Sequence, residues 1–273
     1  MTDLVGPLVL VGCGKMGSAL LRGWLTHGLS TADVFVVEPD AASREGARAQ
    51  HRVSAEAGAA GLPADLRPRA LVLAIKPQSM AAVLPAYRAL ARSGAVVLSI
   101  AAGTAIARFT AAFGAGTPVV RAMPNTPAAI GEGVTALYAN ANVSAAQAQL
   151  CEALMAAVGA VHWIDDEDQM HAITAMSGGG PAYVFLLIEA LAKAGIACGL
   201  PADLAWPLAR ATVAGSGALA AHSDEPVEVL RQNVTSPGGT TQAALEVLMA
   251  EDGIGALLER AIAAATRRSH ELA

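Results

Sequence analysis

The stretch Val9-Leu10-Val11-Gly12-Cys13-Gly14-Lys15-Met16-Gly17 decides the fold of this chain. Its glycines form a GxGxxG pattern between an apolar run and the helical pattern that starts Ser18-Ala19-Leu20-Leu21. In such a strand–turn–helix the first glycine makes a tight turn, the second admits a pyrophosphate, and the third lets helix and strand pack closely. The helix N-terminus then faces the phosphates. A chance Gly-rich turn is the alternative, but the flanking patterns favour a dinucleotide site at Gly12, Cys13, Gly14, Lys15, Met16 and Gly17.

Short apolar runs alternate with helical patterns through the first 165 residues. The β-type runs lie at residues 9–11, 34–37, 70–75, 96–100, 119–122 and 135–138. Continuous apolar strands separated by helices indicate a parallel sheet covered on both faces. Right-handed crossovers make such a sheet doubly wound. We therefore predict an α/β N-terminal domain, doubly wound and Rossmann-like, that binds a dinucleotide and covers residues 1–164.

The pattern changes to successive helices from Asp168 onward. Pro181 suits a first helical position, Gly199 suits a helix end, and Pro201 suits the start of the next helix. No strand-like alternation is present in this half. We predict an all-α C-terminal domain over residues 165–273, with the boundary in the acidic turn at residues 165–168.

Composition argues for a soluble, cytoplasmic protein. The net charge of −5 offers no electrostatic footprint for nucleic acid. Although 54% of residues are hydrophobic, the longest apolar runs are strand-length, short of the roughly 20 residues that span a membrane. The start Met1-Thr2-Asp3 lacks the basic region of a signal peptide. The expected partners include neither nucleic acid nor membrane.

An acidic residue, Glu38, ends the second predicted strand. A carboxylate at this place typically binds the adenine ribose and repels the 2′-phosphate of NADP, which favours NADH. Arg44 and Arg48 are close enough in sequence to bind a phosphate instead, and a solvated turn acid is a further alternative. The cofactor is therefore expected to be NADPH or NADH, with the preference open.

Two further predicted strands end in abrupt turns. Ala74-Ile75-Lys76-Pro77 follows one, and Ala101-Ala102-Gly103 follows another. Ligands of open α/β sheets lie beyond the carboxyl ends of the strands. We therefore add these seven residues to the expected cofactor site.

A second candidate site for an anion lies at Ser236-Pro237-Gly238-Gly239-Thr240-Thr241. This Gly-rich turn leads directly into the helical pattern at residues 242–249. Backbone N–H groups at a helix start form a ready anion site. The alternative is a plain helix N-cap by Thr240 or Thr241.

Five motifs carry a resemblance to a known family. Met123-Pro124-Asn125-Thr126-Pro127 resembles the MPNTP element of the pyrroline-5-carboxylate reductases, which make proline. Residues 74–78, 99–103, 177–183 and 233–241 resemble further motifs of that family, in the same order. Gly179 departs from the pattern where the family often has Ser, and Glu38 departs from that of NADPH-preferring members.

The resemblance implies a reaction and a substrate site. The chain is expected to reduce 1-pyrroline-5-carboxylate to L-proline with NADPH or NADH, as an enzyme acting on a CH–NH bond. It implies Asn125 as a cofactor residue and Thr241 as the catalytic residue, whose hydroxyl orients the ring nitrogen. The implied substrate-binding residues are Glu167, Asn233, Ser236, Gly238, Gly239, Thr240 and Thr241. It also implies a homodimer or larger homo-oligomer through the helical domain.

Other interpretations are less favoured. A β-hydroxyacid dehydrogenase needs a catalytic lysine shortly after its second-domain glycines, where this chain has Val184, and Lys193 lies too far along. A dinucleotide sensor without activity would not need the second anion site. Glu167 could also be a solvated linker acid, and Asn233 a helix cap. We expect His171 to lie on a helix surface rather than act as a general acid. No histidine spacing indicates a metal site.

Overall fold

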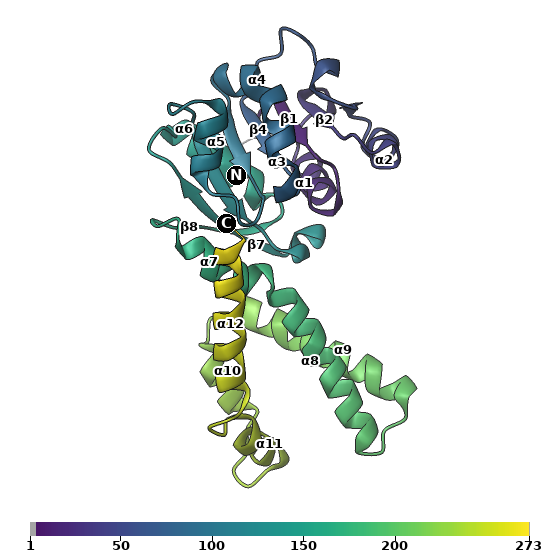
Figure 1. Cartoon of the computed structure of the whole chain (residues 1–273). Coiled ribbons are helices and arrows are strands. Elements are labelled where there is room, and N and C mark those ends of the chain that lie inside the picture. The colour runs from purple at the N-terminus through teal and green to yellow at the C-terminus, as the bar shows by residue number, and fades with distance from the viewer. Residues whose placement is uncertain (1–3, 273) are drawn as a thin grey trace. The chain divides into compact units, whose positions relative to one another are not determined.

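The computed structural model describes residues 4–272, so the expectation about Met1-Thr2-Asp3 lies outside the described residues. The chain divides into two compact units (Figure 1). The first comprises residues up to Gly178 together with those from Thr266 onward, and the second comprises Gly179–Ala265. This division by contacts places residues 165–178 and the end of the chain with the sheet, whereas the sequence pattern grouped residues 165–273 together.

The first unit is built on a sheet of eight strands in the order β3-β2-β1-β4-β5-β6-β7-β8. The strands are β1 (Leu8–Val11), β2 (Val34–Val37), β3 (Ser54–Glu56), β4 (Ala70–Leu73), β5 (Val96–Ser99), β6 (Val119–Met123), β7 (Gly133–Ala139) and β8 (Gly159–Trp163). All neighbours are parallel except β6 and β7, which run antiparallel. The predicted Rossmann-like fold is confirmed, with one antiparallel pair that the sequence pattern did not indicate.

Helices cover both faces of this sheet. They are α1 (Lys15–Thr26), α2 (Ala41–His51), α3 (Met80–Val83), α4 (Arg88–Arg92), α5 (Ile106–Phe113) and α6 (Ala145–Ala156), and α7 (Gln169–Ile173) follows β8 along the chain. Short 3-10 turns, among them η3 (Pro77–Ser79), η4 (Leu84–Tyr87) and η5 (Thr126–Ile130), complete the connections.

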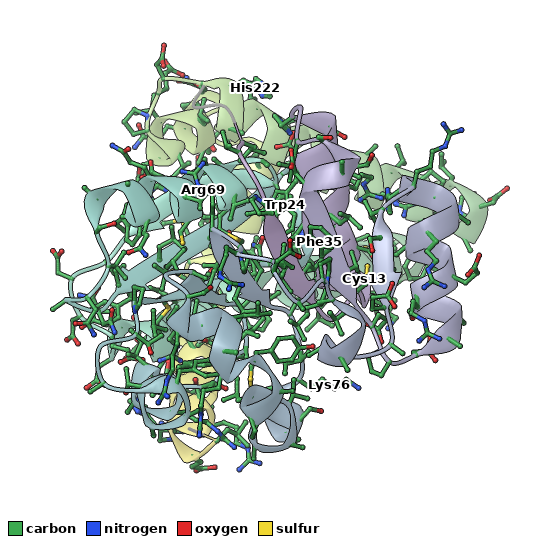
Figure 2. All side chains as sticks on the ribbon, turned by 90° about the horizontal axis from the view of Figure 1, so that it is seen from above. Cys13, Trp24, Phe35, Arg69, Lys76 and His222 are labelled. Carbon is green, nitrogen blue, oxygen red and sulfur yellow. The ribbon has the colours of Figure 1, made fainter. Side chains whose placement is uncertain are left out.

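The core has two halves because successive strand residues point to opposite faces. Leu8 and Leu10 join Trp24 of α1 and Leu154 of α6 in one buried cluster. Val9 and Val11 join η4 and α5 residues in the other cluster. Burial on both faces explains why β1, β4 and β5 are apolar at nearly every position. Trp24, labelled in Figure 2, is fully buried, and its Nε1–H donates to the Leu154 carbonyl at 2.8 Å.

Two of the eight strands, β3 and β8, were not predicted from the sequence. β3 has only three residues, two of them polar, and β8 is largely exposed. Both are edge strands, which bury one face or less and so lack a continuous apolar run. The strands that position the glycine loop, β1, β2 and β4, were all predicted from the sequence.

The second unit is helical. It contains α8 (Gly180–Ala197), α9 (Ala202–His222), α10 (Val227–Asn233), α11 (Thr240–Leu248) and the beginning of α12 (Ile254–Glu271), whose last residues belong to the first unit. Pro181 lies in the first turn of α8, Gly199 follows its end with φ +99°, and Pro201 precedes α9. The predicted all-α half is therefore confirmed, and so are the expected positions of these proline and glycine residues at the helix ends.

Large apolar side chains are exposed along these helices. Phe185, Leu186 and Leu187 of α8 and Trp206 of α9 are each more than two-fifths exposed. The helical stretch Gln169–Ala197 contains an 18-residue window of mean hydropathy 1.4 and is long and apolar enough to cross a membrane by length and composition alone. The expectation that apolar runs stay at strand length missed this stretch because polar residues interrupt it. Exposed apolar surface of this kind is typical of interaction sites.

Candidate active site

The glycine loop has the geometry that a dinucleotide requires. Gly12 has φ +91°, and a Cβ built on it would lie 2.5 Å from the Ala74 carbonyl oxygen. A Cβ on Gly17 would lie 2.2 Å from the Gly12 carbonyl oxygen, so only glycine lets α1 approach the loop this closely. By contrast, no described atom lies within 4 Å of a Cβ on Gly14. The space in front of Gly14 is open, as a pyrophosphate-binding backbone needs.

Strand ends converge at the loop. Gly12 N–H donates to the Val37 carbonyl at 2.8 Å, and Ala74 N–H donates to the Val11 carbonyl at 2.8 Å. The residues that follow β1, β2 and β4 are thus held side by side at the carboxyl ends of these strands. Ala101, Ala102 and Gly103 follow β5, which is parallel to β4, and so lie on the same side of the sheet, at the carboxyl ends of the strands.

Glu38 is part of this loop rather than a solvated turn acid. The residue is only 8% exposed. Its Oε2 accepts the N–H of Cys13 at 2.7 Å, and its Oε1 accepts the N–H of Asp40 at 2.9 Å. The carboxylate therefore joins the end of β2 to the turn of the glycine loop.

A cavity of about 520 Å³ lies beside the first turn of α1. Its lining comes from the glycine loop, α1 and α2, namely Cys13, Gly14, Lys15, Ser18, Ala42, Ser43, Gly46, Ala47, Gln50 and His51. Lys15 and Lys76 are both exposed, and Cys13 and Lys76 are labelled in Figure 2. Lysines in these two turns are available to a phosphorylated ligand.

Cys13 is a packing residue of the loop. Burial raises the pKa of its thiol, an effect that outweighs the lowering by the Ser18 hydroxyl 3.4 Å away. A thiol that stays protonated at neutral pH is neither a nucleophile nor a metal ligand.

Asn125 is engaged within the first unit. Its Oδ1 accepts the N–H of Val134 at 3.0 Å, and its Nδ2 donates to the Ser177 carbonyl at 3.3 Å. Ser177 belongs to the π-helix η6 (Thr174–Gly178). The amide thus links the turn after β6 to β7 and to this π-helix.

Glu167 forms a structural ion pair. Its Oε1 accepts from Arg121 Nη1 at 3.0 Å and from the backbone N–H of Ile106 at 2.8 Å. The Arg121 side chain is 4% exposed and that of Glu167 is 26% exposed. The carboxylate therefore compensates a buried guanidinium and the first turn of α5, and the alternative of a solvated linker acid is wrong.

His171 does not lie on a helix surface, as the sequence suggested. It is 6% exposed, its Nδ1 lies 2.9 Å from the Ser269 hydroxyl, and its ring stacks on that of His270 at 3.8 Å. Burial and the charges of His270 and Arg121 lower the pKa of His171. A neutral imidazole held in this way is a packing group.

The second candidate site is a tight turn in the helical unit. Gly239 N–H donates to the Ser236 carbonyl at 3.0 Å, and Gly238 has φ +68°. Pro237 and Gly238 occupy the central positions that a type II turn favours for these residue types. The turn delivers the chain directly to Gly239, the N-cap residue of α11.

The N-terminus of α11 has free donors. No side chain caps it, and the first helical bond runs from Ala243 N–H to the Gly239 carbonyl. The alternative in which Thr240 or Thr241 caps the helix is therefore wrong. Among residues 4–272, no partner for the N–H groups of Thr240 and Thr241 is found. Two N–H groups and two hydroxyls thus remain for an anion.

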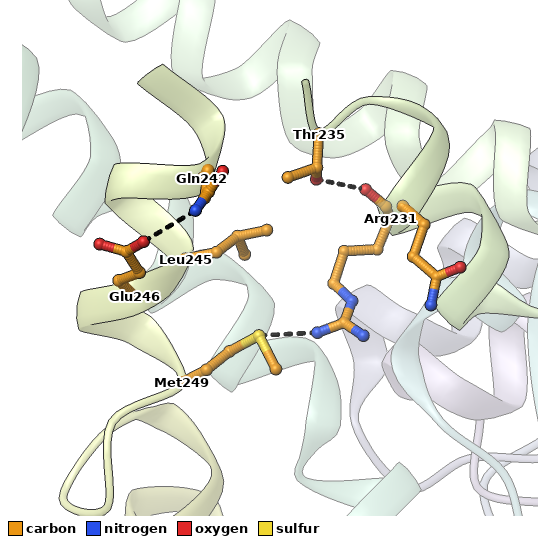
Figure 3. A pocket seen from close by; sticks show the side chains of 7 residues that line it. Arg231, Thr235, Gln242, Leu245, Glu246 and Met249 are labelled. Carbon is orange, nitrogen blue, oxygen red and sulfur yellow. Dashed lines mark hydrogen bonds between the residues drawn. The ribbon is translucent and has the colours of Figure 1, made fainter. Parts of the chain in front are cut away.

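Gln242 fixes this turn, a role that the sequence analysis missed. Gly238 N–H donates to Gln242 Oε1 at 2.7 Å, and Gln242 Nε2 donates to Glu246 Oε1 at 3.0 Å. Figure 3 shows Gln242 and Glu246 on α11, facing Arg231 and Thr235 across a cavity of about 440 Å³. The four-residue spacing of Gln242 and Glu246 on α11 is the sequence signal for the bond between these two side chains.

Asn233 is the last residue of α10 and is exposed. Its Nδ2 donates to Glu225 Oε2 at 3.1 Å. The side chain therefore links the end of α10 to the loop before it, and its amide oxygen Oδ1 accepts no hydrogen bond from residues 4–272.

Among residues 4–272, no three histidine, cysteine or acidic side chains lie close enough to hold a metal ion.

Known proteins resemble this chain over its whole length. Residues 167–272 match the family model for pyrroline-5-carboxylate reductase dimerisation, and residues 7–103 match that for NADP oxidoreductase, coenzyme F420-dependent. The chain is 41% identical to a pyrroline-5-carboxylate reductase of Pseudomonas aeruginosa over 267 residues, 97% of this chain and 96% of the relative.

Solved structures agree with these matches. A pyrroline-5-carboxylate reductase from Coxiella burnetii superposes with a TM-score of 0.92 at 33% identity and covers 98% of both chains. The pyrroline carboxylate reductase of Plasmodium falciparum, solved with NADP bound, gives a TM-score of 0.81 at 30% identity over 97% of both chains. The chain belongs to the pyrroline-5-carboxylate reductase family.

Proposed function

We propose that this enzyme reduces 1-pyrroline-5-carboxylate to L-proline by hydride transfer from NADPH or NADH, the last step of proline biosynthesis. The observation that carries the proposal is the start of α11, where two N–H groups are free for a small carboxylate in a chain that also has a dinucleotide loop. Family membership over the whole chain supports the same reaction.

The cofactor-binding residues we propose lie at the strand ends of the first unit. They are Gly12, Cys13, Gly14, Lys15, Met16, Gly17, Glu38, Ala74, Ile75, Lys76, Pro77, Ala101, Ala102, Gly103 and Asn125. The residues present fit a dinucleotide, because the open space at Gly14 adjoins the N-terminus of α1. When bound, the reduced nicotinamide supplies the hydride for the imine carbon.

The substrate carboxylate is proposed to bind at the turn before α11. Thr240 and Thr241 donate their backbone N–H groups, and the exposed Ser236 adds its hydroxyl. Gly238 and Gly239 shape the turn, since their own N–H groups are used by Gln242 and Ser236. Asn233 precedes the turn and offers its carbonyl oxygen.

Thr241 is the proposed catalytic residue. Its hydroxyl orients the ring nitrogen, but a Thr hydroxyl is a poor acid at neutral pH and does not originate the proton. The rate gain then comes chiefly from proximity and orientation. Glu167, through its Oε2 atom, is proposed to favour a cationic iminium.

Residues 165–273 are proposed to bind substrate and to form a cytoplasmic homodimer or larger homo-oligomer. The exposed apolar side chains of α8 and α9 support this, since a second copy would cover them. Light scattering tests the assembly, and a monomer at micromolar concentration would contradict it.

Adding 1-pyrroline-5-carboxylate to the purified chain with NADH or NADPH tests the reaction. We expect loss of reduced-nicotinamide absorbance with formation of proline in equal amount. Cofactor binding without turnover of the imine would overturn the proposal and leave a dinucleotide sensor.

A further inference from the structure

We propose that the enzyme prefers NADH to NADPH, and that the end of β2 makes the choice. This inference rests on the proposed cofactor site at the glycine loop. It concerns the adenine ribose, the part at which the two cofactors differ. NADH has a 2′-hydroxyl there, whereas NADPH carries a 2′-phosphate.

Glu38 is the residue that meets this ribose. In a dinucleotide fold the acidic side chain at the end of the second strand accepts the ribose 2′-hydroxyl. Glu38 is held for this task, because Cys13 N–H and Asp40 N–H each donate to one of its two oxygens. With 8% exposure it cannot swing into solvent to make room for a phosphate.

The nearest helix N-terminus is not available to a 2′-phosphate. α2 begins immediately after Asp40, and a helix start is the usual place for such an anion. Here Asp40 Oδ2 already accepts the N–H of Ser43 at 2.8 Å. The N-terminus of α2 therefore carries a carboxylate of its own, which adds to the repulsion from Glu38.

The arginines at this strand end are also engaged by the protein. Arg44 Nη1 donates to the carbonyls of Glu38 at 2.8 Å and Pro39 at 3.0 Å. Arg48 donates to the Ala55 carbonyl and lies between Glu45 and Glu56. Lys15 is exposed and lines one cavity with Ser43 and His51 of α2. At the end of β2 itself, Glu38 and Asp40 are acidic and both arginines are held by the protein, so the charge there is acidic.

Steady-state kinetics of the wild-type enzyme with each cofactor test the preference. We expect kcat/KM for NADH to exceed that for NADPH by at least about tenfold, the effect of one hydrogen bond to a charged group. Equal values, or a preference for NADPH, would overturn the inference. Fluorescence titration of each cofactor without imine separates the two proposals, because failure to bind either cofactor would overturn the proposed function instead.

Glu38→Gln and Glu38→Ser then test the residue. Both remove the charge, and Gln keeps one acceptor oxygen for the loop, so at least one variant is expected to fold. The ratio of kcat/KM for NADH to that for NADPH should fall about tenfold or more. Glu152→Gln is the control, since Glu152 on α6 contacts Trp163 of β8, at the opposite end of the sheet from β2, and its ratio should stay unchanged. A ratio unaltered in the folded Glu38 variants would overturn the assignment to Glu38.

Discussion

The backbone N–H of Gly238 donates to the side-chain oxygen of Gln242 at 2.7 Å, and this bond closes the turn at the start of α11. Because Gly238 has φ +68°, the turn depends on a conformation that few residues adopt. The neighbouring free N–H groups of Thr240 and Thr241 take their direction from this turn. Gln242 is therefore a positioning residue for the proposed carboxylate site.

Replacing Gln242 by Ala should raise KM for the imine about tenfold, since the N–H groups lose their fixed direction, with kcat changed much less. Gln242→Glu keeps an acceptor oxygen for Gly238, but it places a second carboxylate beside Glu246 and the substrate carboxylate, so its KM should rise as well. Gln232→Ala is the control, because Gln232 lines the same cavity from α10. A fall in kcat alone, with KM unchanged, would contradict the positioning role.

Replacing Thr241 by Ala should lower kcat/KM for the imine about ten- to hundredfold, since the hydroxyl that orients the ring nitrogen is lost. Thr241→Ser keeps the hydroxyl and should retain most of the activity. Steady-state kinetics at saturating cofactor measure both variants. Unchanged kcat/KM in Thr241→Ala would remove Thr241 from the reaction.

Two alanine substitutions in the glycine loop should affect different properties, one the stability of the fold and the other the binding of the cofactor. Gly17→Ala places a Cβ 2.2 Å from the Gly12 carbonyl, so the free energy of unfolding should fall by about 1–3 kcal/mol or more. Gly14→Ala meets no protein atom within 4 Å and should fold normally but bind the cofactor weakly. Thermal unfolding and cofactor titration of both variants check this, and normal cofactor affinity in folded Gly14→Ala would count against the pyrophosphate assignment.

Replacing Glu167 by Gln should destabilise the first unit. The substitution leaves the buried Arg121 guanidinium without a carboxylate, and we expect the free energy of unfolding to fall by about 1–3 kcal/mol. Denaturant unfolding measures the loss. Glu152→Gln is a control on the same unit, since the Glu152 carboxylate accepts the N–H of the exposed Trp163 indole and compensates no buried charge among residues 4–272. Equal stability of Glu167→Gln and wild type would show that the pair is dispensable.

His171 should make stability depend on pH. Its pKa is lowered in the folded state, so below the unfolded value of 6.5 the unfolded chain binds more protons. The contribution of His171 is fully present above that value and is lost as the pH falls. Urea unfolding at descending pH should show the decline, and His171→Phe, which keeps a stacking ring for His270, should weaken it. A decline of the same size in His171→Phe would assign it to other groups.

Local features of the chain were predictable because their cause lies within a few residues. The glycine loop, the Gly-Gly turn before α11, and the proline and glycine positions around α8 and α9 each follow from backbone conformation. The central parallel strands were found because burial on both faces makes them apolar throughout. The edge strands β3 and β8 lack that signal, and so does the antiparallel direction of β7.

The sequence by itself determined the family, the alternation of the central strands with helices, and the two glycine-rich turns that precede α1 and α11. Only the tertiary structure decided which polar groups meet across long separations. Glu38 reaches Cys13 from 25 residues away, Glu167 reaches Arg121 from 46, and His171 reaches Ser269 from 98. Hydrophobic periodicity and turn residues depend on interactions between residues that are close in sequence. The partner of a buried charge depends instead on how distant segments pack.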